Sequence, residues 1–260
     1  MTERFTIGDA PKRREDARFV TGQGRYLDDL RFDNMSQAVL LRSPHAHARI
    51  DGIDVSGALA APGVLAVLTA VDVTSDGLHP LRPTVEANVQ TGEPFAFLPQ
   101  PLLAMGKVRF AGEPVVLVVA ETRAQAMDAA ELVQIDYAAL PAVTDADAAR
   151  AAGAPELAAE VPGNVCLNWR TGNIEAAEAA FAAAAHVVRL RLDNHRIVTN
   201  PMEPRGLVGL YDPGEDRYTA YVSSQNIHIN RDNIAKALAV RPASPSVITG
   251  SLPRGSWVSR

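Results

Sequence analysis

An uninterrupted apolar run at residues 115–119 constrains the fold of this chain most, because all five side chains are Val or Leu. A strand of this kind has to be covered on both faces, since successive side chains point to opposite sides of a sheet. Thr122 has a side chain typical of a helix N-cap, which predicts a helix from there to about Val133. A strand is predicted next, at residues 134–137. This order predicts an α+β or α/β region, with a mixed sheet favoured over a fully parallel one because strongly apolar runs are few.

Shorter signals predict further elements around that run. Apolar stretches at residues 37–42, 64–69 and 107–110 are typical of strands, and residues 56–61 are typical of a short helix. Residues 75–105 are rich in Pro and Gly and show no period. Loops of that length are uncommon in compact domains unless they contact something, so we expect this connection to make contacts.

A second region is predicted after residues 146–164, a stretch of mostly Ala, Pro and Gly that is typical of a linker. Asn173 is the expected N-cap of a helix over residues 174–185, whose alanines suit close packing on a sheet. Residues 186–194 then alternate apolar and charged side chains, which predicts a half-exposed strand. Strands are also predicted at 207–211 and 218–222, joined as a hairpin, with a helix after them at 229–240.

The turn before that last helix is the most polar stretch that follows a strand. Ser223, Ser224, Gln225 and Asn226 lie where a strand gives way to a helix. Such turns place polar side chains and free backbone N–H groups at the edge of a sheet, where ligands bind. Ser and Asn are also ordinary turn residues, so the pattern alone leaves a purely structural role open.

Charge and composition exclude several functional classes. The net charge of −5 gives no electrostatic reason to expect binding to nucleic acid or to an anionic membrane. No apolar run reaches the length of a membrane-spanning helix, and the first residues lack the apolar core of a signal peptide. A cytoplasmic location is therefore the default expectation.

Three other features could carry chemistry. Cys166 is the single cysteine and is expected to be a buried, inert thiol between Val165 and Leu167. His45 and His47 would share one face of a strand, but without a third ligand nearby a structural role is favoured over a metal site. The two glycines of residues 21–24 suggest a phosphate loop, yet no helix-forming run follows them, so a turn is expected instead.

Six stretches together resemble a known family, in the family's order and spacing. They lie at residues 14–29, 42–50, 108–115, 194–196, 201–205 and 223–226. From about residue 8 to about 249 the chain is similar to the large, molybdenum-binding subunit of the xanthine dehydrogenase, aldehyde oxidase and aerobic carbon monoxide dehydrogenase group. The resemblance implies an α+β fold, in which an α/β hammerhead domain precedes the incomplete start of a molybdenum-cofactor-binding domain. The expected boundaries are 1–20 for an N-terminal arm, 21–145 for the hammerhead domain, 146–164 for a linker, 165–250 for the start of the cofactor-binding domain and 251–260 for an atypical tail.

The resemblance also implies an activity. In the family, a glutamine at the position of Gln225 hydrogen-bonds an oxo ligand of molybdenum, which suits an amide because its N–H donates without adding a charge. The implied reaction is the oxidation or hydroxylation of an aldehyde, N-heterocycle or similar small molecule by a molybdenum–molybdopterin cofactor in its cytosine dinucleotide form. Electrons would then pass to an iron–sulfur small subunit and an FAD-binding medium subunit of a hetero-oligomer. A single cysteine agrees with iron–sulfur clusters on another chain.

The chain departs from the family in its last stretch. The family continues with a glycine-rich loop that holds the pterin, whereas residues 241–260 hold three arginines and no acid. No position matches the family's catalytic glutamate, so no catalytic residue is predicted. Glu203 lies among prolines and is expected to be a structural pin, a side chain that fixes the backbone rather than taking part in chemistry. Under the first hypothesis, the chain is part of a molybdenum hydroxylase that is inactive alone and retains no cofactor. The second is a non-catalytic remnant or a docking module for the partner subunits.

Overall fold

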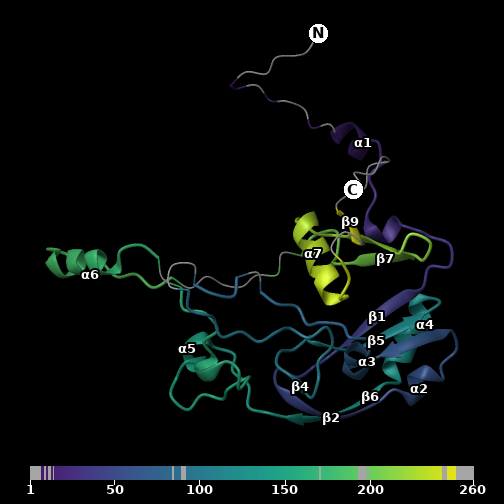
Figure 1. The fold of residues 1–260 in the computed structure, drawn as a ribbon, viewed down its shortest axis with the longest axis horizontal. Helices are drawn as coiled ribbons and strands as arrows, with labels where there is room; N and C mark the ends of the chain where they lie inside the picture. Colours follow the sequence, from purple (N-terminus) through teal and green to yellow (C-terminus); the bar gives the residue numbers. More distant parts are fainter. Residues whose placement is uncertain are drawn as a thin grey trace. The chain divides into compact units, whose positions relative to one another are not determined.

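The chain folds into two compact units, Asn34–Val198 and the combination of Met1–Asp33 with Thr199–Arg260 (Figure 1). We call them the larger unit and the smaller unit and describe each by itself. The computed structural model describes residues 7, 8, 10, 13, 15–83, 85–88, 92–169, 171–192, 198, 200–241 and the backbone of 245–249. The family-like stretch at 194–196 and the predicted tail at 251–260 lie outside the described residues. In the described part of the chain, no helix combines the length and apolar character needed to cross a membrane.

The larger unit is organised around strand β5 (Pro114–Ala120), which contains the apolar run. Its neighbours are β1 (Gln37–Arg42) and β3 (Val64–Leu68), and the strand order is β1-β5-β3. Both pairings are antiparallel, with Val118 opposite Val39 on one side and Val67 on the other. The prediction of a strand covered on both faces is confirmed, since Val115, Val116 and Val118 are fully buried.

Helix α4 (Arg123–Glu131) lies against β1 and β5 and closes the core of the larger unit (Figure 1). The predicted cap is confirmed, because the Thr122 hydroxyl accepts the Gln125 N–H at 3.3 Å. Three alanines of the helix are buried against the sheet, at positions 126, 129 and 130. Their small side chains let the helix backbone approach the valine-rich strand closely.

A second sheet of the larger unit has the order β4-β2-β6, and all of its pairings are antiparallel. Its strands are β4 (Lys107–Val108), β2 (Ala48–Asp54) and β6 (Gln134–Ala139). The expected mixed sheet was therefore wrong for the described part of this region. Each of its strands pairs antiparallel with its neighbours, and among the described residues a parallel pair is found only in the smaller unit.

Two short helices flank β3. Helix α2 (Ser56–Leu59) precedes the strand, and α3 (Ala70–Ser75) follows it. Helix α3 begins with a capping box, in which Asp72 Oδ2 accepts the Thr69 N–H at 2.7 Å and the Thr69 hydroxyl at 2.8 Å. The Thr69 hydroxyl oxygen in turn accepts the Val71 N–H at 3.3 Å. These bonds satisfy backbone donors that the first turn of a helix leaves free.

The capping box makes a prediction about acid stability. The hydrogen bond from the Thr69 N–H lowers the pKa of Asp72 below its ordinary value. A lowered folded-state pKa means that the stabilisation is complete above the unfolded pKa of about 3.9 and is lost as the pH falls through the folded value. Asp72 is partly exposed, so we expect Asp72→Asn to cost only about 0.5 kcal/mol at pH 7 and almost nothing near pH 2.

Urea unfolding at the two pH values measures this difference. Asp76→Asn is the matched control, because Asp76 lies at the other end of α3 and makes no side-chain hydrogen bond to the described residues. An equal loss of stability for Asp72→Asn at both pH values would contradict the role of the ionised carboxylate.

Residues 75–105 have little regular structure, as predicted. Two isolated bridges, Leu81 with Gln100 and Ala87 with Pro94, are the β-pairing found in their described part. After them, residues 145–166 fold as a compact loop with α5 (Ala146–Ala149) and the 3-10 helix η2 (Pro162–Asn164). Ala158 and Val161 of this loop are buried.

Helix α6 (Ile174–Ala183) and the residues after it do not pack as predicted. The Asn173 cap is confirmed, since its Oδ1 accepts the Ala176 N–H at 2.9 Å. However, none of the residues of α6 is buried. The predicted strand at 186–194 was wrong over residues 186–192, which form no ladder, and residues 193–194 lie outside the described part of the chain. A strand requires a partner for its backbone groups, and an alternating pattern cannot supply one.

Cys166 is exposed, so the expectation of a buried thiol was wrong. It is the last residue of the folded loop at 145–166 rather than part of a covered strand. We therefore expect about one thiol per native chain to react with Ellman's reagent at pH 8 within minutes and without denaturant. The variant Cys166→Ser should give no signal. A thiol that reacts only after denaturation would show that the side chain is covered in solution.

The smaller unit contains a three-stranded sheet of order β7-β8-β9. The predicted hairpin is confirmed, as β7 (Leu207–Asp212) pairs antiparallel with β8 (Arg217–Val222). Strand β9 (Pro245–Thr249) pairs parallel with β8, and α7 (Ile227–Ala237) connects the two and lies against β9. The unit also includes α1 (Asp16–Val20), within the predicted N-terminal arm, and the 3-10 helix η1 (Leu27–Asp29).

Candidate functional site

The predicted polar turn lies between β8 and α7, where the chain leaves the edge of the sheet. Strand β8 is the central strand of its sheet, so its end is fixed on both sides by β7 and β9. The turn starts at Ser223, and the helix starts at Ile227. The prediction of a strand-to-helix turn is therefore confirmed, and with it the placement of Gln225 at a sheet edge.

Both serines of the turn are held by hydrogen bonds. The Ser223 hydroxyl donates to the Pro204 carbonyl and accepts the Gly206 N–H, each at 3.2 Å. The Ser224 hydroxyl accepts from Asn230 Nδ2, one turn into α7. These bonds tie the turn to the segment before β7 on one side and to the helix on the other.

Gln225 differs from the two serines, because its side chain is exposed and its amide makes no hydrogen bond to the described residues. The following residue, Asn226, is the N-cap of α7 but makes no side-chain capping bond. The first N–H groups of α7 therefore have no side-chain acceptor in the described part of the chain.

This turn offers donors rather than ligands for a metal. An amide NH2 and the N–H groups at the start of a helix both donate hydrogen bonds, and a helix start also favours negative charge. The residues fit the oxygen-rich side of an anionic cofactor, where each oxygen can accept such a bond. No cluster of three His, Cys, Asp or Glu side chains among the described residues is arranged to hold a metal ion.

The two histidines of the family-like stretch 42–50 do not form a site. His47 is buried, and its Nδ1 donates to the Pro141 carbonyl at 2.7 Å. His45 contacts the ring of Tyr137 instead, with ring centroids 4.8 Å apart. Burial also raises the pKa of Tyr137. The structural role that the sequence favoured for both histidines agrees with these contacts.

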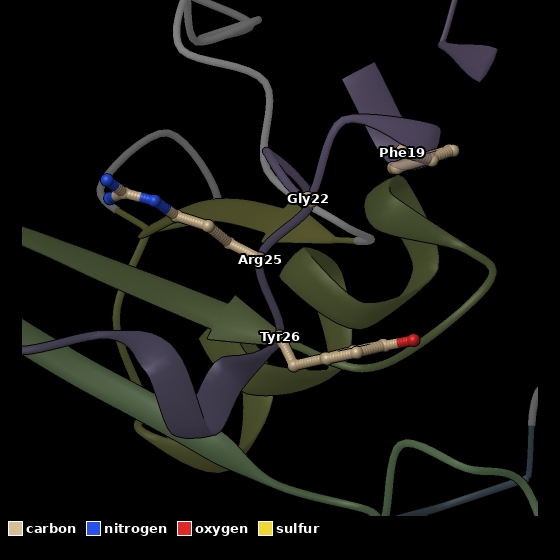
Figure 2. Close-up of a pocket in the computed structure, with 5 residues that line it drawn as sticks. Phe19, Gly22, Arg25 and Tyr26 are labelled. Atoms are coloured by element: carbon tan, nitrogen blue, oxygen red, sulfur yellow. The ribbon is translucent and has the colours of Figure 1, made fainter. Parts of the chain in front are cut away.

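The glycine turn at 21–24 is not a phosphate loop. It follows helix α1 instead of opening a helix, and the Gly22 N–H donates to the Phe19 carbonyl at 3.1 Å. The Gln23 N–H is likewise taken by the Arg18 carbonyl at 2.9 Å. The turn lines a hollow of about 430 Å³, in which Arg25 and Tyr26 point to opposite sides (Figure 2). The Gly22 and Gln23 N–H groups are used internally, so the turn has fewer backbone donors left to hold a phosphate.

Two family models match the chain in succession. The model of the aldehyde oxidase and xanthine dehydrogenase a/b hammerhead domain matches residues 21–141, and that of the molybdopterin cofactor-binding domain matches residues 157–252. The chain belongs to the family of molybdenum hydroxylase large subunits. Its α+β fold is that of a hammerhead domain followed by the start of a cofactor-binding domain. The turn at Gln225 lies in the second match.

Individual relatives agree with this family. The chain is 41% identical over 225 residues to the nicotine 6-hydroxylase large subunit of Paenarthrobacter nicotinovorans, covering 86% of this chain and 27% of the relative. It is 36% identical over 237 residues to the carbon monoxide dehydrogenase large chain of Afipia carboxidovorans, covering 86% and 28%. The solved structure of quinoline 2-oxidoreductase from Pseudomonas putida 86 superposes with a TM-score of 0.81 at 39% identity, covering 96% of this chain and 31% of that one. The chain thus spans less than a third of the length of these molybdenum hydroxylase relatives.

Sequence reasoning did not connect the N-terminal segment with the unit that contains this turn. Residues 26–33 were assigned to the hammerhead region, which the family model also covers, and in the structure they lie in the same compact unit as the Gln225 turn. Glu203 Oε1 accepts the Leu27 N–H at 3.0 Å, as expected of a structural pin. The one available signal was the rigid stretch at 201–205, which suggested a pin without naming its partner.

Proposed function

We propose that this chain forms the N-terminal part of a molybdenum hydroxylase large subunit and that Gln225 contacts the cofactor. The observation that carries the proposal is the amide of Gln225, which is exposed at a strand-to-helix turn inside the cofactor-binding match and makes no hydrogen bond to the described residues. The cofactor would be molybdenum–molybdopterin in its cytosine dinucleotide form, which supplies the chemistry of two-electron oxidation when bound. The substrate would be a small molecule such as an aldehyde or an N-heterocycle.

The role of Gln225 follows from the chemistry of its side chain. The NH2 group donates a hydrogen bond toward a cofactor oxygen and orients it without introducing a charge. The Ser223 and Ser224 bonds hold the backbone on the N-terminal side of Gln225, so the amide starts from a fixed position. A donor fixed before the ligand arrives loses less conformational freedom on binding than a mobile one.

We infer that the chain alone binds the cofactor poorly. Side chains 225–229 are all exposed, whereas cofactor sites bury most of the surface of their ligand. The partners proposed for the complete protein are an iron–sulfur small subunit and an FAD-binding medium subunit, in a hetero-oligomer. Membership of this family and the name of a relative that is a dehydrogenase complex subunit support this arrangement.

A hybrid large subunit tests the proposal. This chain would be fused to the part of the nicotine 6-hydroxylase large subunit that lies beyond the matched region, and produced with that relative's partner subunits in a host that makes the cofactor. We expect close to one molybdenum per hybrid chain by mass spectrometry. A folded hybrid that recruits the partner subunits but contains no molybdenum would contradict the proposal and favour a docking module.

Gln225→Ala in that hybrid tests the residue itself. Loss of one donor to a charged oxygen should lower kcat by about tenfold to a hundredfold, since such bonds contribute about 1.5–3 kcal/mol. Gln134→Ala is the matched control, because Gln134 is an exposed glutamine on β6 in the larger unit. Equal activities of the two variants would remove Gln225 from the proposed site.

A further inference from the structure

The smaller unit joins two segments that are far apart in the sequence through the side chain of Glu203. Its Oε1 accepts the Leu27 N–H at 3.0 Å across 176 positions of the chain. The bond is partly buried, and hydrogen bonds from a backbone N–H to an ionised carboxylate are stronger than those between neutral groups. Glu203 therefore fixes the start of η1 against the stretch that leads into β7.

The Leu27 side chain approaches the Gly206 backbone closely at the same place. A Cβ atom built on Gly206 would lie 3.2 Å from Leu27 Cδ1, which is tighter than an ordinary contact. The Gly206 N–H donates to the Ser223 hydroxyl, and that hydroxyl donates to the Pro204 carbonyl. Residues 203–206 are thus held by Leu27 on one side and by Ser223 on the other.

A second contact connects the N-terminal segment to the same strand. The ring of Phe32 lies 5.6 Å from the ring of Tyr221, centroid to centroid. Tyr221 is the penultimate residue of β8, two positions before Ser223 and four before Gln225. The N-terminal segment therefore contacts both the stretch at 203–206 and the end of β8.

We propose that Glu203 is a positioning residue for Gln225, acting through Leu27, the 204–206 backbone and Ser223. This inference rests on the proposed contact between Gln225 and the cofactor. Glu203 itself touches neither substrate nor cofactor in this scheme. Its carboxylate fixes Leu27 of the N-terminal segment through a hydrogen bond, and Leu27 in turn packs against Gly206 and limits the movement of residues 204–206. Ser223 hydrogen-bonds to those residues and so fixes the position of the turn.

Glu203→Ala and Glu203→Gln in the full chain separate positioning from a general effect on folding. We expect the alanine variant to exchange the Leu27 amide proton at least tenfold faster by NMR and to shift the side-chain NH2 resonances of Gln225. The glutamine variant keeps an acceptor oxygen and should leave both signals near the wild type. Glu215→Ala is the control, because Glu215 is a surface residue of the same unit that pairs with Arg217; it should change neither signal.

Removal of the donor gives an independent test if Glu203→Ala fails to fold. Leu27→Pro deletes the N–H at the first position of η1, and Tyr26 before it is extended with ψ of 169°, which a following proline tolerates. We expect the same Gln225 shifts. Unchanged Gln225 resonances in Leu27→Pro or in a folded Glu203→Ala would overturn the proposal. Because these measurements need no cofactor, a hybrid without molybdenum would count against the proposed function and leave this coupling standing.

Discussion

Placing a carboxylate at Val118 will unfold the larger unit or leave it barely stable. Val118 is fully buried at the centre of β5, between Val39 on β1 and Val67 on β3. Val118→Asp would put a charge without a partner into this apolar layer, or force the acid to remain protonated. Either outcome costs about 4 kcal/mol or more, which is a large part of the stability of a typical domain.

Urea unfolding followed by circular dichroism measures this loss. Leu65→Asp is the matched control, since Leu65 lies on the neighbouring strand β3 and is 59% exposed. We expect the control to change the free energy of unfolding by less than about 1 kcal/mol. Similar losses for the two variants would mean that β5 is not the covered strand of this unit.

The part of the fold around β5 could be predicted from the sequence because its signals are local. An apolar run, a threonine cap and a short return strand lie within about 25 residues, and each indicates the same arrangement. Direction of pairing is different, because it depends on which strands become neighbours in space. The local pattern does not indicate which strands are neighbours. The sheet predicted to be mixed is antiparallel in the described part of the larger unit.

Helix α6 and residues 186–192 show the limit of periodicity. The alternation of Val188, Leu190 and Leu192 with charged residues is that of a half-buried strand. These three side chains are 79–91% exposed, because nothing in the described residues covers them or pairs with their backbone. A hydrophobic pattern records that a face is suited to burial, and it carries no information on what lies opposite.

In the candidate site too, the local features could be predicted and the long-range contacts could not. The turn at Gln225 follows from a strand, a polar cluster and a helix in sequence, so its position could be predicted. The Leu27–Glu203 bond joins residues 176 positions apart, and no periodicity links them. The prediction of a buried Cys166 was wrong for a related reason. Its neighbours Val165 and Leu167 suggested burial, but they are themselves exposed.

Replacing Asn164 by alanine will open the loop at residues 145–166. The Asn164 side chain donates to the carbonyls of Ala149 at 3.0 Å and Pro155 at 2.9 Å, and accepts the Leu157 N–H at 3.0 Å. Its backbone also has a φ of 57°, a left-handed conformation that asparagine tolerates better than alanine. Three bonds at about 1 kcal/mol each and about 1 kcal/mol of backbone strain predict a local loss of about 4 kcal/mol.

Hydrogen exchange of the Leu157 amide reports this opening, because its N–H loses its acceptor in Asn164→Ala. The control is Asn34→Ala, since Asn34 has the same φ of 57° but no side-chain hydrogen bond to the described residues. Asn34→Ala should show only the cost of the strained backbone, and Asn164→Gly should show only the loss of the three hydrogen bonds. The three variants therefore separate the effect of strain from the effect of the hydrogen bonds. The loop packs Ala158 and Val161 into the larger unit, so its opening should also expose this region to proteases. Equal exchange in Asn164→Ala and Asn34→Ala would mean that burial of Ala158 and Val161, rather than the asparagine, closes the loop.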